Sequence, residues 1–206
     1  MGNGNLDLIR IYVSADSEKR VDLIIRNYPN FLGMVDGYTE GLCYMIENEK
    51  ESNSRHESGA LGVRIQGGNG MSDPTARKAI RNVMLFDALV NCDFSGDIME
   101  GVDCAETYME DAYVLRDMRK DYALFNSQLS ILGTQQDFFT KYLRKEISLT
   151  DVAEDQGITY EAARQKIYKI RQRLTRQGIS FMDREKALLH GKGAAADPGD
   201  QQTYGV

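Results

Sequence analysis

The sequence predicts an all-α protein, with an N-terminal helical hairpin and long helices followed by a C-terminal helix-turn-helix. Three observations lead to this fold class. Apolar residues recur every three to four positions through most of the 206 residues, capping residues precede these stretches, and glycine or proline interrupts them. Residues 6–13, in which apolar residues alternate, fit a strand as well as the start of a helix.

Residues 1–50 are predicted to form the helical hairpin. One helix is expected over residues 16–26 and a second over residues 30–50, and Pro29 separates them. The second helix carries an apolar stripe whose spacing is typical of packing and not of a ligand site. The stripe consists of Phe31, Met34, Tyr38, Leu42 and Met45.

Residues 51–71 differ in composition from the rest of the chain. They are rich in Gly, Ser, Asn and charged residues and include Gly67-Gly68-Asn69-Gly70, so a linker or loop is predicted. The glycines are not followed by the Gly-Lys-Ser/Thr motif of a phosphate-binding loop, which argues against a nucleotide site.

Residues 72–132 are predicted to form a body of long helices. Ser72-Asp73-Pro74 is a helix start, because a capping residue precedes a proline at the first helical position. That helix is expected to reach about residue 91, and a second should cover residues 105–132 and end at Gly133. The expected packing residues are Ile80, Val83, Met84, Ala88 and Leu89 in the first helix, and Tyr108, Ala112, Leu115, Met118, Tyr122, Leu124, Phe125 and Leu129 in the second.

Residues 133–190 are predicted to form the helix-turn-helix domain, and residues 191–206 a disordered tail that has too little apolar content to bury. Thr134 should cap a supporting helix that contains Phe138, Phe139, Tyr142 and Leu143. Ser148 should cap a short helix whose apolar side is Leu149, Val152 and Ala153, and Gly157 should end it. Thr159 should cap the last helix, whose apolar stripe is Ala163, Ile167, Ile170 and Leu174.

The other side of that last helix carries polar and basic side chains suited to the major groove of DNA. Arg binds guanine and Gln binds adenine with two hydrogen bonds each, so Arg164 and Gln165 are the principal candidates for reading bases. Glu161 is placed to accept from cytosine or to orient Arg164, and Tyr160 and Tyr168 complete the candidate base-reading set, with their roles open. The candidate phosphate contacts are Lys166, Lys169, Arg171 and Arg173.

Charge is distributed unevenly along the chain, whose formal net charge is −6. Residues 93–122 include nine acidic residues, whereas residues 164–176 include none. An acidic body with one basic helix should bind nucleic acid through that helix and repel it elsewhere.

Several classes of function are not expected. The sequence has no motif of an enzyme active site, so no catalytic residue and no cofactor is predicted. Cys43, Cys92 and Cys104 are widely spaced and fit no metal motif, which favours a reduced, cytoplasmic setting without a metal site. No apolar run is long enough for a membrane span, and no membrane partner is expected.

The stretch of roughly residues 135–177 resembles region four of bacterial sigma factors, which carries similar SLxxVAxxxGIT and ExxRQ patterns on the two helices that read promoter DNA. Asn27-Tyr28-Pro29-Asn30 and Ser72-Asp73-Pro74-Thr75-Ala76 resemble short motifs of RinA-like and ArpU-like phage regulators. The resemblance implies a transcriptional activator of late phage genes, with double-stranded DNA and host RNA polymerase as partners.

A second class of function fits the same pattern. Small terminase subunits of phages also join a helix-turn-helix to helical oligomerisation segments, but they recognise DNA for packaging. In that case the helices before Leu132 would build a ring, whereas an activator would use them to contact polymerase or to form a homo-oligomer. The sequence leaves the operator and the oligomeric state open.

Overall fold

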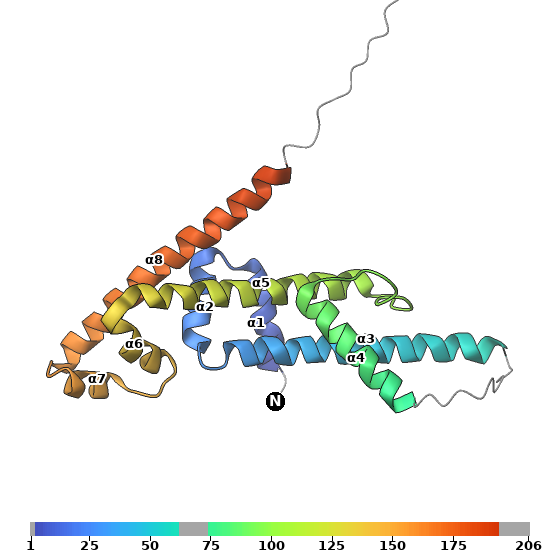
Figure 1. The fold of residues 1–206 in the computed structure, drawn as a ribbon, viewed down its shortest axis with the longest axis horizontal. Helices are drawn as coiled ribbons and strands as arrows, with labels where there is room; N and C mark the ends of the chain where they lie inside the picture. The colour runs from blue at the N-terminus through green and yellow to red at the C-terminus, as the bar shows by residue number, and fades with distance from the viewer. Residues whose placement is uncertain (1–2, 62–73, 194–206) are drawn as a thin grey trace, which may run out of the picture. The chain divides into compact units, whose positions relative to one another are not determined.

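The computed structural model describes residues 3–61 and 74–193, and these contain helices and no strand (Figure 1). The all-α prediction is therefore confirmed, and residues 6–13 lie within helix α1 (Asn3–Ser14). The chain divides into two compact units. Among the described residues, the first comprises 3–14, 27–61 and 74–123, and the second comprises 15–26 and 124–193.

The first unit contains α1, α3 (Phe31–Leu61), α4 (Pro74–Asn91) and most of α5 (Ala105–Leu129). Its core consists of apolar side chains at helical spacing, as expected from the sequence for α5 and for part of α3. Met45 is an exception, because its side chain is exposed. The buried apolar residues include Tyr12, Phe31, Val35, Leu42, Ile46, Leu85, Leu89, Ala112, Leu115 and Met118.

Polar contacts tie the helices of this unit together. The buried Tyr12 hydroxyl of α1 donates a hydrogen bond of 2.7 Å to Asp121 Oδ2 of α5. Arg119 of α5 donates to Asp36 Oδ1 at 3.0 Å and to Thr39 Oγ1 at 2.7 Å, both on α3. The Phe31 and Tyr122 rings stack with centroids 5.6 Å apart. These contacts pair the buried Tyr12, Thr39 and Asp121 side chains across the helices that the apolar core brings together.

The predicted linker over residues 51–71 is wrong for its first part, because α3 continues unbroken to Leu61. The part of α3 after residue 50 consists mainly of polar residues and has no apolar stripe. Ion pairs help to stabilise this part of the helix. Glu51 pairs with Arg55 one turn later at 3.3 Å and with Lys78 of α4 at 2.8 Å. Residues 62–71, and the predicted cap at Ser72 and Asp73, lie outside the described residues.

The prediction for the packing side of α4 is only half correct. Ala88 and Leu89 are buried, together with Leu85. Ile80, Val83 and Met84 are instead 61%, 61% and 56% exposed. Helix α4 has apolar residues on two sides, and periodicity alone did not identify which side faces α3.

The second unit contains α2 (Ser17–Asn27), the end of α5, a 3₁₀ segment η1 (Ser130–Gln135), α6 (Gln136–Leu143), α7 (Leu149–Asp155) and α8 (Tyr160–Gly193). The Ser17 hydroxyl of α2 donates to Asp183 Oδ1 of α8 at 2.6 Å. A Cβ added to Gly178 of α8 would lie 3.0 Å from Val21 Cγ2 of α2. Helix α2 therefore packs on α8 within the second unit, whereas the predicted hairpin grouped it with residues 30–50.

The entry to α6 also differs from the prediction. Gly133 has φ 56° and breaks the helical path as expected, but α5 ends at Leu129 and η1 follows. Thr134 lies inside η1, and the residue before α6 is Gln135, whose side chain makes no capping hydrogen bond. Because η1 leads directly into α6 with helical backbone angles, no side-chain cap is needed there.

Candidate nucleic-acid interface

Helix α7 begins at a capping box formed by Ser148 and Asp151. The Asp151 backbone N–H donates to Ser148 Oγ at 3.3 Å, and the Ser148 backbone N–H donates to Asp151 Oδ2 at 2.7 Å. The Ser148 hydroxyl also donates to Asp151 Oδ2 at 2.8 Å, and the hydrogen bonds that the Ser148 backbone and hydroxyl donate to this carboxylate lower its pKa below the ordinary value of 3.8. The predicted cap at Ser148 is confirmed, and its reciprocal partner is Asp151.

The turn after α7 has the geometry that the sequence predicted. Gly157 adopts φ 62°, in the left-handed region that glycine reaches at low cost. The Ile158 backbone N–H then donates to Ala153 O at 2.9 Å, and the Ile158 side chain packs against the cluster of Val152, Ala153 and Ala163. Thus one glycine both ends α7 and directs an apolar residue into the core below α8.

Thr159 caps helix α8, because its Oγ1 accepts a hydrogen bond of 3.2 Å from the Ala162 N–H, so this predicted cap is also confirmed. The predicted apolar stripe is buried throughout, with Ala163, Ile167, Ile170 and Leu174 at most 6% exposed. Phe138 of α6 packs against the α7–α8 cluster, and Phe139 and Leu143 are buried as expected of a supporting helix. The stripe fixes which side of α8 faces outward.

The candidate base-reading residues all lie on that outward side. The Arg164 side chain is 65% exposed, and its Nε lies 3.3 Å from Glu161 Oε1. The Gln165 side chain is exposed and makes no hydrogen bond with another described residue. Tyr160 and Tyr168 are 54% and 59% exposed, and the Tyr168 hydroxyl accepts a hydrogen bond of 2.6 Å from Gln172 Nε2. The sequence offered cytosine or Arg164 as the partner of Glu161, and in this structure the Glu161 carboxylate lies beside Arg164.

The four candidate phosphate residues fall into two groups. Lys169 and Arg173 are exposed, and neither pairs with an acidic side chain within the described part of the chain. Lys166 instead donates to Gln156 Oε1 at 2.6 Å, and its Nζ lies 5.1 Å from the centre of the Phe138 ring. Arg171 pairs with Asp22 of α2. Of these four candidates, Lys169 and Arg173 are therefore the two that extend toward solvent without an acidic partner among the described residues.

The contribution of α2 was missed by reasoning from the sequence. Asp22 contacts both Arg171 and Arg26, the latter at 2.6 Å. Next to this cluster is a cavity of about 540 Å³, lined among others by Arg26, Lys145, Ser148 and Arg171. Asp22 and Arg171 are 149 residues apart, and no local pattern in the sequence connects them.

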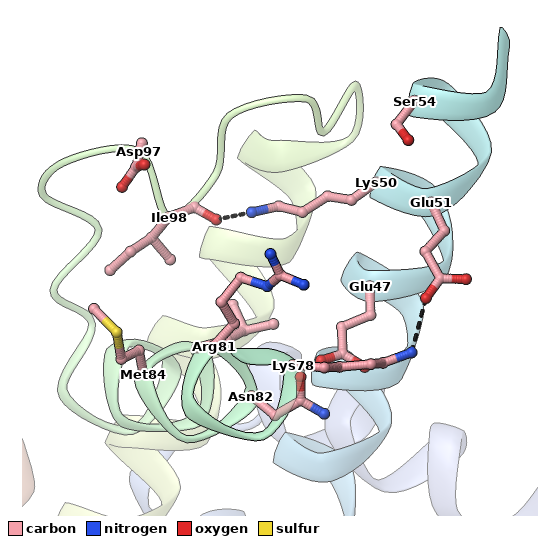
Figure 2. Close-up of a pocket in the computed structure, with 11 residues that line it drawn as sticks. Glu47, Lys50, Glu51, Ser54, Lys78, Arg81, Asn82, Met84, Asp97 and Ile98 are labelled. Carbon is pink, nitrogen blue, oxygen red and sulfur yellow. Dashed lines mark hydrogen bonds and ion pairs between the residues drawn. The ribbon is translucent and has the colours of Figure 1, made fainter. Parts of the chain in front are cut away.

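A second cavity, of about 500 Å³, lies in the first unit between α3, α4 and the segment before α5 (Figure 2). Lys78 pairs there with Glu51, and Lys50 donates to the backbone carbonyl of Ile98. The hydrogen bond from Lys78 and its positive charge lower the pKa of Glu51, while the same hydrogen bond and the negative charge of Glu51 raise the pKa of Lys78. Figure 2 also shows the guanidinium of Arg81 extending from α4 into the cavity. These contacts join α3 to its neighbours, so we interpret the cavity as part of the packing of this unit.

No group of three or more His, Cys, Asp or Glu side chains among the described residues is arranged to hold a metal ion. No helix among them is both long and apolar enough to cross a membrane.

Comparison of the chain with protein-family models, with curated proteins and with solved structures gives no match.

Proposed function

We propose that this protein is a sequence-specific, double-stranded-DNA-binding transcriptional regulator that activates late genes of a phage or mobile element together with host RNA polymerase. The observation that carries the proposal is the outward side of α8. Arg164 and Gln165 are exposed there, above a buried stripe that fixes the orientation of the helix. A helix so oriented can enter the major groove with these two side chains directed at base edges.

The contacts around these residues suggest a division of roles. Glu161 forms an ion pair with Arg164 and so restrains its guanidinium before DNA binds. The guanidinium then loses less conformational entropy when it binds a guanine. Lys169 and Arg173 have no acidic partner among the described residues and can reach phosphates, which adds affinity that does not depend on base sequence. Recognition would then rest on Arg164 and Gln165, and salt-dependent affinity on the unpaired cations.

The first experiment tests this division with the full chain. Selection from a random duplex library gives the preferred site, and fluorescence anisotropy then measures affinity for that site and for random DNA at several salt concentrations. Arg164→Ala and Gln165→Ala should each relax preference at one or two base pairs, by about 1–3 kcal/mol. Lys169→Ala should weaken both DNAs alike and lower the salt slope by about one.

Arg184→Ala is the matched control, because Arg184 is an exposed cation on the same helix but lies further along it. It should leave preference and salt slope close to those of the unmodified protein. If Arg164→Ala and Gln165→Ala lowered affinity equally for selected and random DNA, the proposed base-reading role would be wrong.

The second experiment tests activation itself. A template carrying the selected site is transcribed with host RNA polymerase, with and without the protein. Transcript that depends on both the protein and the site supports the proposal. A stable ring that binds the site and yields no additional transcript would instead favour a DNA-packaging subunit, the alternative that the sequence left open.

A further inference from the structure

Helix α4 exposes an apolar side to solvent. Ile80, Val83 and Met84 are 61%, 61% and 56% exposed, and Ala76 is exposed one turn before Ile80. Ala76, Ile80 and Val83 lie on the side away from Leu85 and Leu89, which pack within the first unit, and Met84 lies at the edge of that side, where it also lines the cavity of Figure 2. Contiguous apolar side chains on a surface are typical of a site where another surface binds. We call this set of Ala76, Ile80, Val83 and Met84 the α4 face.

Two opposite charges flank the α4 face. Arg77 and Asp87 are both exposed, and neither side chain makes an ion pair or hydrogen bond with another residue that the structure describes. They are ten positions apart in an unbroken helix, which corresponds to about 15 Å along its axis. Their midpoint is position 82, which is also midway between Ile80 and Met84.

We propose that the α4 face binds the same face of a second copy of this chain, with the two α4 helices antiparallel and the two-fold axis passing near position 82. In that arrangement Ile80 lies level with the partner's Met84, and Arg77 lies level with the partner's Asp87. Each contact occurs twice, because a two-fold interface is self-complementary. The apolar side chains are covered and both flanking charges gain an opposite charge.

The same charges select this orientation over the other. A parallel pairing about the α4 face would place Arg77 beside the partner's Arg77 and Asp87 beside the partner's Asp87. Like charges at one level of a helix pair are unfavourable, so the parallel arrangement is disfavoured. A two-fold contact closes on itself, and we therefore expect a dimer and not a ring or a filament. This inference goes beyond the proposed function and does not depend on it.

Sedimentation equilibrium of the full chain over a range of protein concentrations tests the proposal. The unmodified protein should dimerise. Val83→Asp should raise the dimer dissociation constant about tenfold or more, because it places an unpaired carboxylate in an apolar contact. Tyr44→Asp is the control, since Tyr44 is 67% exposed on α3, and it should leave the dissociation constant unchanged. Circular dichroism confirms that both variants retain their helices.

Charge reversal tests orientation separately from apolar contact. Arg77→Asp and Asp87→Arg should each raise the dissociation constant by about two- to fivefold, because each reversal changes two pairs in a two-fold dimer. The double variant exchanges the charges and should restore dimerisation. A monomer at all concentrations, dimerisation unaffected by Val83→Asp, or a double variant weaker than both single variants would overturn the proposal.

Discussion

The connection between α7 and α8 depends on the backbone conformation of a single residue. Gly157 has φ 62°, and nothing lies within 4 Å of the position where a Cβ would stand. A side chain there would therefore meet no steric obstacle beyond its own backbone. The loss of unfolding free energy on replacing Gly157 should then come from the left-handed backbone conformation alone. A substitution at Gly157 therefore measures backbone strain without a contribution from packing, in the turn that sets the angle between α7 and α8.

Gly157→Ala should lower the free energy of unfolding by about 1 kcal/mol, and Gly157→Asn by less, because Asn tolerates the left-handed region better. Urea denaturation followed by circular dichroism measures both. Gly33→Ala is the control, since Gly33 lies inside α3 with open space around it, and it should stabilise the protein by roughly 0.5–1 kcal/mol. Equal effects of the two alanine substitutions would contradict this account of the turn.

The cap of α7 should depend on pH. Hydrogen bonds from Ser148 lower the pKa of Asp151 in the folded protein below 3.8, so its ionised form is favoured by folding. The resulting stabilisation is complete above 3.8 and is lost as the pH falls through the lowered pKa. We therefore expect the difference in unfolding midpoint between the protein and Asp151→Asn to be constant from about pH 7 to pH 5 and to shrink in acid. A carboxyl pKa at or above 3.8, measured by NMR titration, would exclude this mechanism.

At the scale of elements, α2 determines which cations of α8 are available. Asp22 of α2 holds Arg171, while Ser17 of α2 binds Asp183 further along α8. Arg171 is thus neutralised in the structure although it lies on the basic segment that the sequence identified. An acidic side chain that pairs with Arg171 competes with any phosphate for the same guanidinium.

Under the proposed function, Asp22→Asn should release Arg171 for phosphate contact, together with Arg26, which also pairs with Asp22. Affinity for selected and random DNA should rise together, and the salt slope should increase by about one for each released cation that contacts a phosphate. Asp183→Asn provides the control, because it removes a contact between α2 and α8 without freeing a cation. If both substitutions raised affinity equally, loosening of α2 and not release of charge would be the cause.

The elements also show where reasoning from the sequence succeeds and fails. Caps and turns are local, so Ser148, Gly157 and Thr159 could be assigned from neighbouring residues. The buried stripe of α8 followed from periodicity. By contrast, α4 has two apolar sides, and only contact with α3 decides between them. The extension of α3 to Leu61 rests on propensity and ion pairs, which leave no apolar pattern to detect.

The contacts between α2 and α8 could not be predicted from the sequence, because they join residues that are far apart in the chain. Asp22 contacts Arg171, and Ser17 contacts Asp183, because α8 packs against α2 although more than a hundred residues separate them in the sequence. Nothing in the local composition of α2 distinguishes it from an arm of an N-terminal hairpin. The exposed side of α8 was therefore predictable, but the division of its cations into paired and unpaired groups was not.

For the whole molecule, the formal net charge of −6 opposes association with any polyanion. Much of this charge lies in residues 93–122, and it includes the exposed side chains of Glu100, Glu106 and Glu110. None of the three forms an ion pair with another described residue. Their charge therefore remains available to repel DNA phosphates at low ionic strength.

Replacing Glu100, Glu106 and Glu110 together by Gln tests this repulsion. If α8 binds DNA, the variant should associate faster with selected and random DNA at low salt, by a similar factor for each, because the removed charges read no sequence. The advantage should shrink as salt is raised, since at about 0.15 M the screening length is already only about 8 Å. Stopped-flow fluorescence at several salt concentrations measures the rates, and unchanged thermal unfolding excludes a structural effect. Faster association that persisted at high salt, or that affected only the selected site, would show that these carboxylates act through something other than long-range charge.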